Sequence, residues 1–522
     1  MKYLLLTVYL SLRNIARKTI QKIKGIIGSE KTKNKYSKWV SYNKKTFQPR
    51  TSSSSKMILC DVFMVPEWLF VNAFAINELC KKFNCTAASF GNIPRNSTEN
   101  EVYSSFGVNT HLLVKLSSTE MKNRHRSLFN TAKQQINSKE TLFNFEIEGV
   151  HIGVDIYESI LRTGVPTVEN NSLITWQNIY IGLEYYVYFD SLFSEEKIQA
   201  MMLSHDNYIY MGIPSKLGFK YKVSSYLFNA NEFLCLTRPN ELHDRFNLFP
   251  ELFNKLSEQD KRTARNWSKE QLEKRLMGQV GVEMQYQKKS AFTFEKVNTQ
   301  VLNNGKINIV VATHEFYDNP HAYGGLLFLD FYEWLIFLGK LSQNDTYNWY
   351  LKPHRDVAES ELVQLNKICK LYPNFILLDK EYTFHQLKEE GVDIALTCYG
   401  TIGHELPLLG YKVINAGNNP HMAYGFNFHP KNVQEYRQIL LGLDTLKANI
   451  DQNEIYEFFY TYKKIIYPID FSVNKYFPVD ENRTGDVIAD FIKSSDKFKT
   501  DIEKKLKIFI NSGINYSFLL NF

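Results

Sequence analysis

The residues best suited to chemistry lie in one stretch, 396–421, which reads LTCYGTIGHELPLLGYKVINAGNNPH. A buried-strand pattern leads into a turn with Gly400, Thr401 and Gly403, and then into a short apolar segment and a second strand pattern. Free N–H groups where a helix starts favour an anion, and glycines let a phosphate approach the backbone closely. Glu405, just inside this helix, could accept a ribose hydroxyl or complement the helix dipole. The alternative is an ordinary tight turn between a strand and a helix.

Ionisable residues also follow the neighbouring strand patterns of this half of the chain. Because carboxyl ends of parallel strands share one edge of a sheet, we expect these side chains to meet there and to bind a phosphate-containing donor. Candidates for catalysis are His314 and Asp318, and candidates for donor binding are His321, Lys352, His354 and His421. Metal binding is the rival use of these groups. We expect no metal, because the H-E-x-x-H spacing is missing and a lysine would repel a dication.

The first half of the chain offers two candidates for a base on the acceptor side. Asp155 lies near the start of a predicted helix in GVHIGVDIYESILR (149–162), where an ion-paired helix face is the alternative reading. His205 follows a strand pattern and would stand at the carboxyl edge of a sheet. A single histidine at such a place also serves as a capping or core residue. We therefore keep Asp155 and His205 as catalytic candidates.

Composition bounds the class of protein. A chain of 522 residues is too long for one core and predicts two domains, and 44% hydrophobic with 22% charged residues is typical of globular proteins. The six cysteines form no CxxC pair, which indicates a reducing compartment. Thirteen Lys or Arg and one acid fall within residues 1–50, so the remaining chain is mildly acidic. This distribution argues against a nucleic-acid partner, which would need a basic face on the folded domains.

The basic beginning of the sequence has helical periodicity. Apolar residues recur at helical spacing among the basic ones, so residues 1–28 predict an amphipathic helix on an anionic membrane surface. A helix packed on the body, or a disordered basic leader, are the alternatives. Residues 29–56 are polar and end in a serine run, which indicates a linker. We expect a cytoplasmic protein, peripheral on the inner face of the cell membrane.

The rest of the chain alternates strand and helix patterns, which predicts the α/β class with parallel sheets. We expect an N-terminal Rossmann-like domain over 57–296, with a helical insertion or connection at 236–296. A second Rossmann-like domain is expected over 306–480 and would hold the donor site. Helical periodicity over 481–522 predicts helices that pack back on the first domain.

Several motifs together resemble bacterial capsule and surface-polysaccharide biosynthesis proteins. They are HEFYDNPH (314–321), LFLDFYEWL (327–335), YLKPH (350–354), TCYGTIGHELPLLGYKVINAG (397–417), NPH (419–421) and GVHIGVDIYESILR (149–162). The resemblance covers most of residues 57–440. It implies a GT-B-like fold, in which two Rossmann-like domains face a cleft and the C-terminal domain binds a nucleotide-sugar.

The same resemblance implies roles for individual residues. Lys352 and His354 would hold the donor phosphates, because Lys-Pro-His is similar to the His-Pro motif of Kdo- and sialic-acid-transferring GT-B enzymes, although here proline precedes histidine. Gly400 and Thr401 are similar to a phosphate-holding turn. Many retaining GT-B enzymes carry two glutamates eight residues apart, whereas Glu405 has a valine eight positions on, so the ribose-binding pair is incomplete.

The function expected is therefore metal-independent glycosyl transfer without a cofactor, from a nucleotide-sugar to a growing or lipid-linked surface polysaccharide. A glycerol- or ribitol-phosphate transferase of the teichoic-acid type is the first alternative, and would make a phosphodiester instead of a glycosidic bond. A non-catalytic component of polysaccharide assembly or export is the second alternative.

Overall fold

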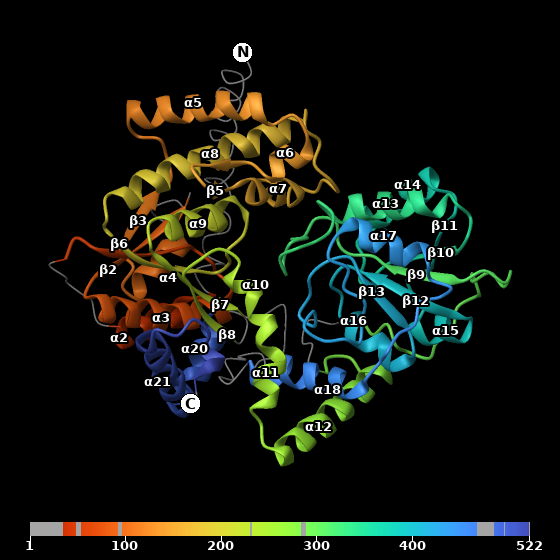
Figure 1. Ribbon diagram of the computed structural model, residues 1–522. Helices are drawn as coiled ribbons and strands as arrows, with labels where there is room; N and C mark the ends of the chain where they lie inside the picture. Colours follow the sequence, from red (N-terminus) through yellow and green to blue (C-terminus); the bar gives the residue numbers. More distant parts are fainter. Residues whose placement is uncertain are drawn as a thin grey trace. The chain divides into compact units, whose positions relative to one another are not determined.

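The computed structural model describes residues 35–47, 54–91, 97–229, 232–282, 289–466, 485–494 and 496–520. The chain folds into two compact units, each considered by itself (Figure 1). Unit 1 comprises Met1–Ile160, Glu169–Pro239 and Tyr467–Phe522, and unit 2 comprises Leu161–Val168 and Asn240–Ile466.

Unit 1 is built on a six-stranded sheet in the order β3-β2-β1-β6-β7-β8. All neighbours are parallel except β7 and β8, which are antiparallel. The strands are β1 (Met57–Cys60), β2 (Thr86–Gly91), β3 (Thr110–Leu113), β6 (Ile198–Leu203), β7 (Ser224–Asn229) and β8 (Glu232–Leu236). The chain leaves β1 toward β3 and returns to the other side of β1 with β6. The carboxyl ends of β1 and β6 therefore form a topological switch point.

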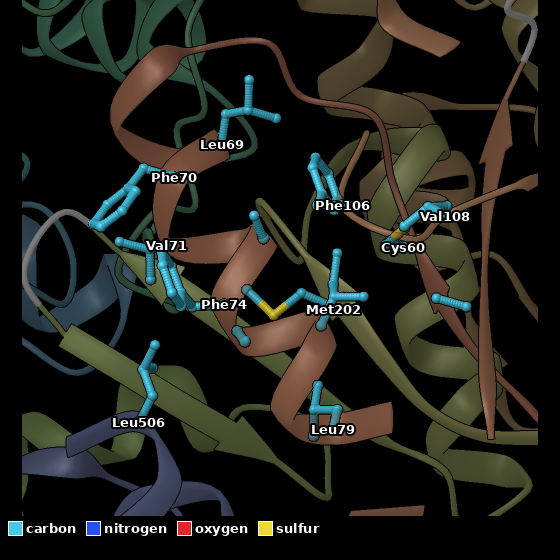
Figure 2. Close-up of a cluster of buried hydrophobic side chains, with 14 of the residues drawn as sticks. Cys60, Leu69, Phe70, Val71, Phe74, Leu79, Phe106, Val108, Met202 and Leu506 are labelled. Carbon is cyan, nitrogen blue, oxygen red and sulfur yellow. The ribbon is translucent and has the colours of Figure 1, made fainter. Parts of the chain in front are cut away.

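The core of unit 1 gathers around helix α3 (Pro66–Phe83), which starts with a proline in its first turn and ends at Asn84 in a left-handed conformation (φ 47°). Figure 2 shows Leu69, Phe70 and Phe74 of α3 in one buried cluster with Met202 of β6 and Leu506 of α21 (Asp496–Ser512). Helix α20 (Gly485–Ser494) lies beside α2 (Ser37–Thr46) in the same part of the unit (Figure 1). The last helices of the chain thus belong to the core of unit 1.

Further helices surround this sheet. They are α4 (Thr98–Ser105), α5 (Thr119–Gln135), α6 (Lys139–Phe143), α7 (Gly153–Leu161), α8 (Leu173–Ser194) and α9 (Ile213–Lys220). Strands β4 (Glu146–Ile147) and β5 (Val150–His151) form a small antiparallel pair before α7.

Unit 2 has a five-stranded parallel sheet in the order β11-β10-β9-β12-β13. The strands are β9 (Asn308–Ala312), β10 (Asn348–Lys352), β11 (Phe375–Leu377), β12 (Val392–Thr397) and β13 (Lys412–Asn415). The chain order reverses between β9 and β12, which makes their carboxyl ends the switch point of this unit. Burial on both faces explains the nearly continuous apolar run of β9.

Helices cover both faces of this sheet. Ile309 and Val311 of β9 pack with α13 (Phe331–Ser342), α14 (Glu359–Leu371) and α17 (Val433–Leu441), whereas Val310 packs with α15 (Phe384–Glu389). This alternation is the period-two pattern of a strand. The remaining helices are α10 (Glu241–Asp244), α11 (Phe249–Asn254), α12 (Glu258–Leu276), α16 (Ile402–Glu405) and α18 (Gln452–Tyr460).

These observations confirm the predicted α/β class with two Rossmann-like units. The division differs from the expected one in two places. Residues 37–46 of the expected linker form helix α2, whose side chains pack into the core of unit 1, and unit 2 already begins at Asn240 and includes α12. Helix α12 packs on α18, and its Arg275 forms a buried ion pair with Glu405, which ties it to unit 2. The helix expected over 1–28 lies outside the described residues. Within the described ranges, no helix is long and apolar enough to span a membrane.

Candidate functional site

A pocket of about 390 Å³ opens at the carboxyl edge of the unit 2 sheet, where β9, β10 and β12 end. Three of the predicted strand ends and the predicted glycine turn meet there. The lining residues are Arg275, Lys289, Ala291, Phe292, Ala312, Thr313, His314, Lys352, Pro353, His354, Arg355, Asp356, Phe384, Thr397, Gly400, Thr401, Ile402 and Glu405. Its position matches the place where ligands bind in open α/β sheets.

Lys352 is the most unusual side chain of the pocket. It is the last residue of β10, pairs in register with Ala312, and is 3% exposed. Among the described residues no hydrogen bond or ion pair holds its ammonium, which lies 5.1 Å from the ring centroid of Phe384. Burial, aided by repulsion from Arg355, lowers the pKa of Lys352 to about 7. A buried ammonium without an anionic partner is costly to fold, which indicates a site for an anion.

His314 lines the same pocket. Its Nε2 atom accepts a hydrogen bond from the Cys398 backbone N–H (3.1 Å) and lies 3.0 Å from the Thr397 hydroxyl oxygen. Its ring stacks on Phe331, with 4.8 Å between the ring centroids. Burial lowers the pKa of His314 to about 3, with a further contribution from His354. The neutral ring therefore carries its proton on Nδ1 and is a hydrogen-bond donor, not a base.

In His354 the other ring nitrogen, Nδ1, is the acceptor. Its Nδ1 atom accepts a hydrogen bond from the Asp356 backbone N–H (3.1 Å), which leaves the proton of the neutral ring on Nε2. The side chain of His354 is exposed to solvent, and partial desolvation by its neighbours lowers its pKa. Arg355 also lines the pocket, and its guanidinium contacts the carbonyl oxygen (2.9 Å) and the carboxylate (3.3 Å) of Glu381. Lys352, His314 and His354 thus supply the hydrogen-bond donors of the pocket.

The glycine turn is fixed by its own side chains. The Thr397 hydroxyl oxygen accepts the Gly400 N–H (3.0 Å) and also lies beside His314, so one threonine fastens both the turn and the ring. The Thr401 hydroxyl donates to Oε2 of Glu405 (3.2 Å). Oε1 of Glu405 accepts from Nε of Arg275 (2.8 Å) and from a second guanidinium nitrogen. Glu405 therefore braces the turn, and Arg275 occupies the oxygen that we expected for a ribose.

The charge of Glu405 is secured by this pair. Burial alone would raise the pKa of its carboxyl group, but the charges of Arg275 and the hydrogen bonds from Arg275 and Thr401 hold the pKa below its ordinary value. The two partners are 3% and 1% exposed. Breaking such a pair leaves a buried charge uncompensated.

Gly403 and His421 lie outside the lining of the pocket. A side chain at position 403 would collide with the ring of His421, at 2.4 Å from Cε1, so this glycine is needed for packing. His421 is 1% exposed, stacks on Phe426, and its Nε2 atom lies 3.0 Å from the amide nitrogen of Asn427. Both residues therefore support the turn from behind.

Asp318 and His321 also stand apart from the pocket lining. Asp318 is exposed and lies 3.5 Å from a guanidinium nitrogen of Arg162. The backbone N–H of His321 donates to the side chain of Asn319 (2.9 Å), which shapes the loop after β9. The pocket gathers His314, Lys352, His354, Gly400, Thr401 and Glu405 from the predicted set.

The two candidates in unit 1 differ sharply from each other. The Asp155 carboxylate is 2% exposed and lies 2.6 Å from Nζ of Lys216, and burial raises its pKa to about 7. One of its oxygens also lies where a side chain at Gly212 would have to be. It is therefore packed and ion-paired. His205 is partly exposed, and its Nδ1 atom lies 3.0 Å from the Ser204 hydroxyl oxygen, at the switch point of the sheet.

One wall of the pocket is apolar. Ala291, Phe292, Phe384 and Ile402 lie beside the donor groups, and the backbone N–H of Phe384 donates to the Ala291 carbonyl oxygen (3.1 Å). In the ranges that the structure describes, no group of three or more His, Cys, Asp or Glu side chains could hold a metal ion. Because an apolar wall lies beside Lys352 and the two histidines, the pocket suits a ligand with an anionic end and a flat, less polar part.

Sequence reasoning missed several members of this site. Thr397 could have been suspected, because a threonine at the end of a buried strand precedes the glycine turn. No local sequence pattern indicates the other four residues, because they come from segments remote in sequence: Arg275, Ala291, Phe292 and Phe384.

No family model matches the sequence, and no curated protein matches it by sequence. Similar solved structures exist. Thermosulfurimonas dismutans KpsC, a beta Kdo 2,4 transferase, is 13% identical over 50% of this chain and 79% of that chain, with a TM-score of 0.30. The wall teichoic acid polymerase TagF is 12% identical over 94% of this chain and 98% of that chain, with a TM-score of 0.20. The UDP-GlcNAc 2-epimerase from Neisseria meningitidis, bound to UDP-GlcNAc, is 13% identical over 84% and 99%, with a TM-score of 0.18.

Proposed function

We propose that this protein is a glycosyltransferase that binds a nucleotide-sugar in the unit 2 pocket and transfers its sugar to a surface polysaccharide. The observation that carries the proposal is Lys352, a buried lysine at the carboxyl end of β10, next to the switch point of an open α/β sheet, whose ammonium has no hydrogen bond or ion pair among the described residues. The motif resemblance supports the same class of reaction.

Phosphate is the anion that fits these donors best. An ammonium and two imidazole rings with N–H groups line the pocket at two strand ends, and phosphate offers several oxygens to accept from them. Negative charge grows on the leaving phosphate as the bond to the sugar breaks. Donors that are already in place stabilise that charge without reorganisation, which is a major source of catalysis in many enzymes. Phosphate binding also returns Lys352 to its charged form.

The apolar wall suits the nucleoside part of the donor. Phe292, Phe384 and Ile402 offer flat or branched apolar surface next to the phosphate end of the pocket. Because Arg275 occupies Glu405, the ribose hydroxyls would find other partners. We propose that transfer needs no metal, since Lys352 supplies the positive charge at the phosphate. Retention of activity in EDTA tests this point.

The acceptor and the membrane remain part of the same proposal. A growing or lipid-linked glycan would supply the acceptor hydroxyl, and residues 1–28 would hold the protein on an anionic membrane surface. Co-sedimentation with vesicles of phosphatidylglycerol and phosphatidylcholine tests the membrane part, because removal of residues 1–28 should abolish binding while the nucleotide response is kept. Equal binding of both forms would refute it.

A thermal-shift panel of UDP, GDP, CDP, CMP and dTDP tests the donor site. A nucleotide at one hundred times its dissociation constant stabilises the folded protein by about 2.7 kcal/mol. We expect one nucleotide to shift wild type and to lose its effect in Lys352→Met and His354→Ala. No shift by any nucleotide, or equal shifts in the variants, would refute the site. Product analysis then separates a glycosidic bond from the phosphodiester of a glycerol- or ribitol-phosphate transferase.

A further inference from the structure

The chain that leaves β10 forms a tight turn at the pocket of unit 2. The backbone N–H of Val357 donates to the carbonyl oxygen of His354 (3.1 Å), and the N–H of Asp356 donates to Nδ1 of the same histidine (3.1 Å). These two hydrogen bonds close residues 354–357 into a turn. Asp356 lies four residues after Lys352 and lines the pocket with it, although no sequence motif indicated this aspartate.

The carboxylate of Asp356 differs from Glu405, the other carboxylate among the described residues that line the pocket. Glu405 is 1% exposed, and its two oxygens accept hydrogen bonds from Arg275 and Thr401. Asp356 is exposed, and within the described ranges no hydrogen bond or ion pair holds its carboxylate. Partial desolvation lowers the pKa of His354, and the negative charge of Asp356 opposes this shift. The carboxylate that is left to accept hydrogen bonds from a ligand is therefore that of Asp356.

The same turn is connected to both ends of the pocket. It directly follows Lys352, which ends β10 at the phosphate end. Arg355 of the turn contacts Glu381, and the carboxylate of Glu381 also lies 3.4 Å from Nζ of Lys289. Lys289 belongs to the same segment as residues 291–292 of the apolar wall. Asp356 thus stands on a turn that joins the phosphate end to a segment of the wall.

The chemistry of a nucleotide matches this order. In every nucleotide the ribose links the phosphate to the base, so a phosphate at Lys352 and a base at the apolar wall bring the ribose to the turn between them. A ribose has two neighbouring hydroxyl groups that can donate, and an ionised carboxylate has two oxygens that only accept. Hydrogen bonds to a charged acceptor are stronger than those to a neutral one. A carboxylate beside a phosphate site without such bonds would only repel the ligand.

We propose that Asp356 determines the sugar specificity of the donor site by accepting hydrogen bonds from the 2′- and 3′-hydroxyl groups of a ribonucleotide, an inference that rests on the proposed function. The site then prefers ribonucleotides to deoxyribonucleotides, because a missing hydroxyl leaves the carboxylate without compensation next to the phosphate. Asp356 takes the role that Glu405 cannot fill while Arg275 occupies it.

Isothermal titration calorimetry tests this specificity with the nucleotide that gives the largest thermal shift. Its ribose, 2′-deoxyribose and 3′-deoxyribose forms are compared, with base and phosphates unchanged and EDTA present. We expect wild type to bind each deoxy form at least about tenfold more weakly, the lower end of the range for a hydrogen bond to a charged group. Asp356→Ala should bind all three forms equally. The ratio decides, because loss of the negative charge changes phosphate binding by the same factor for each form.

Glu359→Ala is the matched control. Glu359 is an exposed carboxylate three residues further along the chain, and it does not line the pocket. This variant should keep the ratio of wild type. Asp356→Ala keeps the backbone N–H that His354 accepts, so the melting temperature without ligand should stay unchanged.

Two kinds of failure can be told apart. Equal binding of ribose and deoxyribose forms by wild type, or an unchanged ratio in Asp356→Ala, would overturn the role of Asp356. An effect of Asp356→Ala that appears only with added Mg²⁺ would also overturn it, because a bridging cation would then replace the hydroxyl groups. In each of these cases the nucleotide still binds, so the proposed donor site would be unaffected. Absence of any nucleotide response in wild type would instead refute the donor site, and the inference with it.

Discussion

Replacing Lys352 with methionine should stabilise the ligand-free protein and abolish nucleotide binding. Methionine keeps the length and apolar stem of lysine without its charge. The pKa of Lys352 in the folded protein is about 7, against an ordinary value of 10.5. At pH 7 this difference corresponds to a destabilisation on the order of 4 kcal/mol, since each pKa unit is worth about 1.4 kcal/mol. A destabilising buried lysine of this kind is expected where its charge serves to bind a ligand.

The sign of this effect depends on pH. Between pH 7 and 10.5 the unfolded chain binds a proton at Lys352 that the folded protein does not bind, so wild-type stability rises with pH in this window. The gain from Lys352→Met should therefore fall from about 4 kcal/mol at pH 7 to about 2 kcal/mol at pH 9. For a unit of this size, the gain at pH 7 corresponds to a melting temperature higher by on the order of 10 °C.

Melting curves at pH 7 and 9, with and without the nucleotide found in the panel, measure both consequences. Lys412→Met is the matched control, because Lys412 lies in the same sheet and its ammonium donates to the Leu446 carbonyl oxygen (2.5 Å). This control should gain no stability and should keep the nucleotide shift. A Lys352→Met protein that is less stable than wild type at pH 7, or that still responds to nucleotide, would refute the reasoning.

Three further predictions concern unit 2. Thr397→Val removes the acceptor of the Gly400 N–H, so we expect a loss of about 1–3 kcal/mol in unfolding free energy and a smaller nucleotide-induced rise in melting temperature. An unchanged rise would contradict the role of this threonine. Arg275→Met leaves Glu405 as an uncompensated buried charge and should lower the free energy of unfolding, measured with denaturant, by about 3–5 kcal/mol. Adding Glu405→Gln to the same chain should restore most of this loss. Losses of the two substitutions that simply add up in the double variant would argue against the pair. Burial lowers the pKa of His404 to about 3 and that of His421 well below its usual range, so the unfolded chain takes up protons first. The contribution of these two histidines to stability should therefore be complete above about pH 6.5 and fall below it by about 1.4 kcal/mol per pH unit for each histidine. Denaturant midpoints that are flat from pH 7 to 5 would disprove this.

The fold class could be predicted because it depends on local patterns. Apolar runs such as 307–313, followed by helical periodicity, can only be buried as strands of a covered parallel sheet. The same patterns located Lys352, His314 and the glycine turn at strand ends, where parallel strands must bring them to one edge. These are consequences of periodicity, which the sequence carries by itself.

What the tertiary structure decided is which groups remain available for chemistry. Glu405 and Asp155 resemble free carboxylates in the sequence, yet each is occupied by a cation that folding brings from elsewhere, Arg275 and Lys216. No local pattern distinguishes Asp61 in the sequence, but in the folded protein its carboxylate accepts a hydrogen bond from Ser204, 143 positions away. Periodicity places a residue on an element, but the partner of a side chain depends on contacts between elements remote in the chain. Only the folded structure contains those contacts.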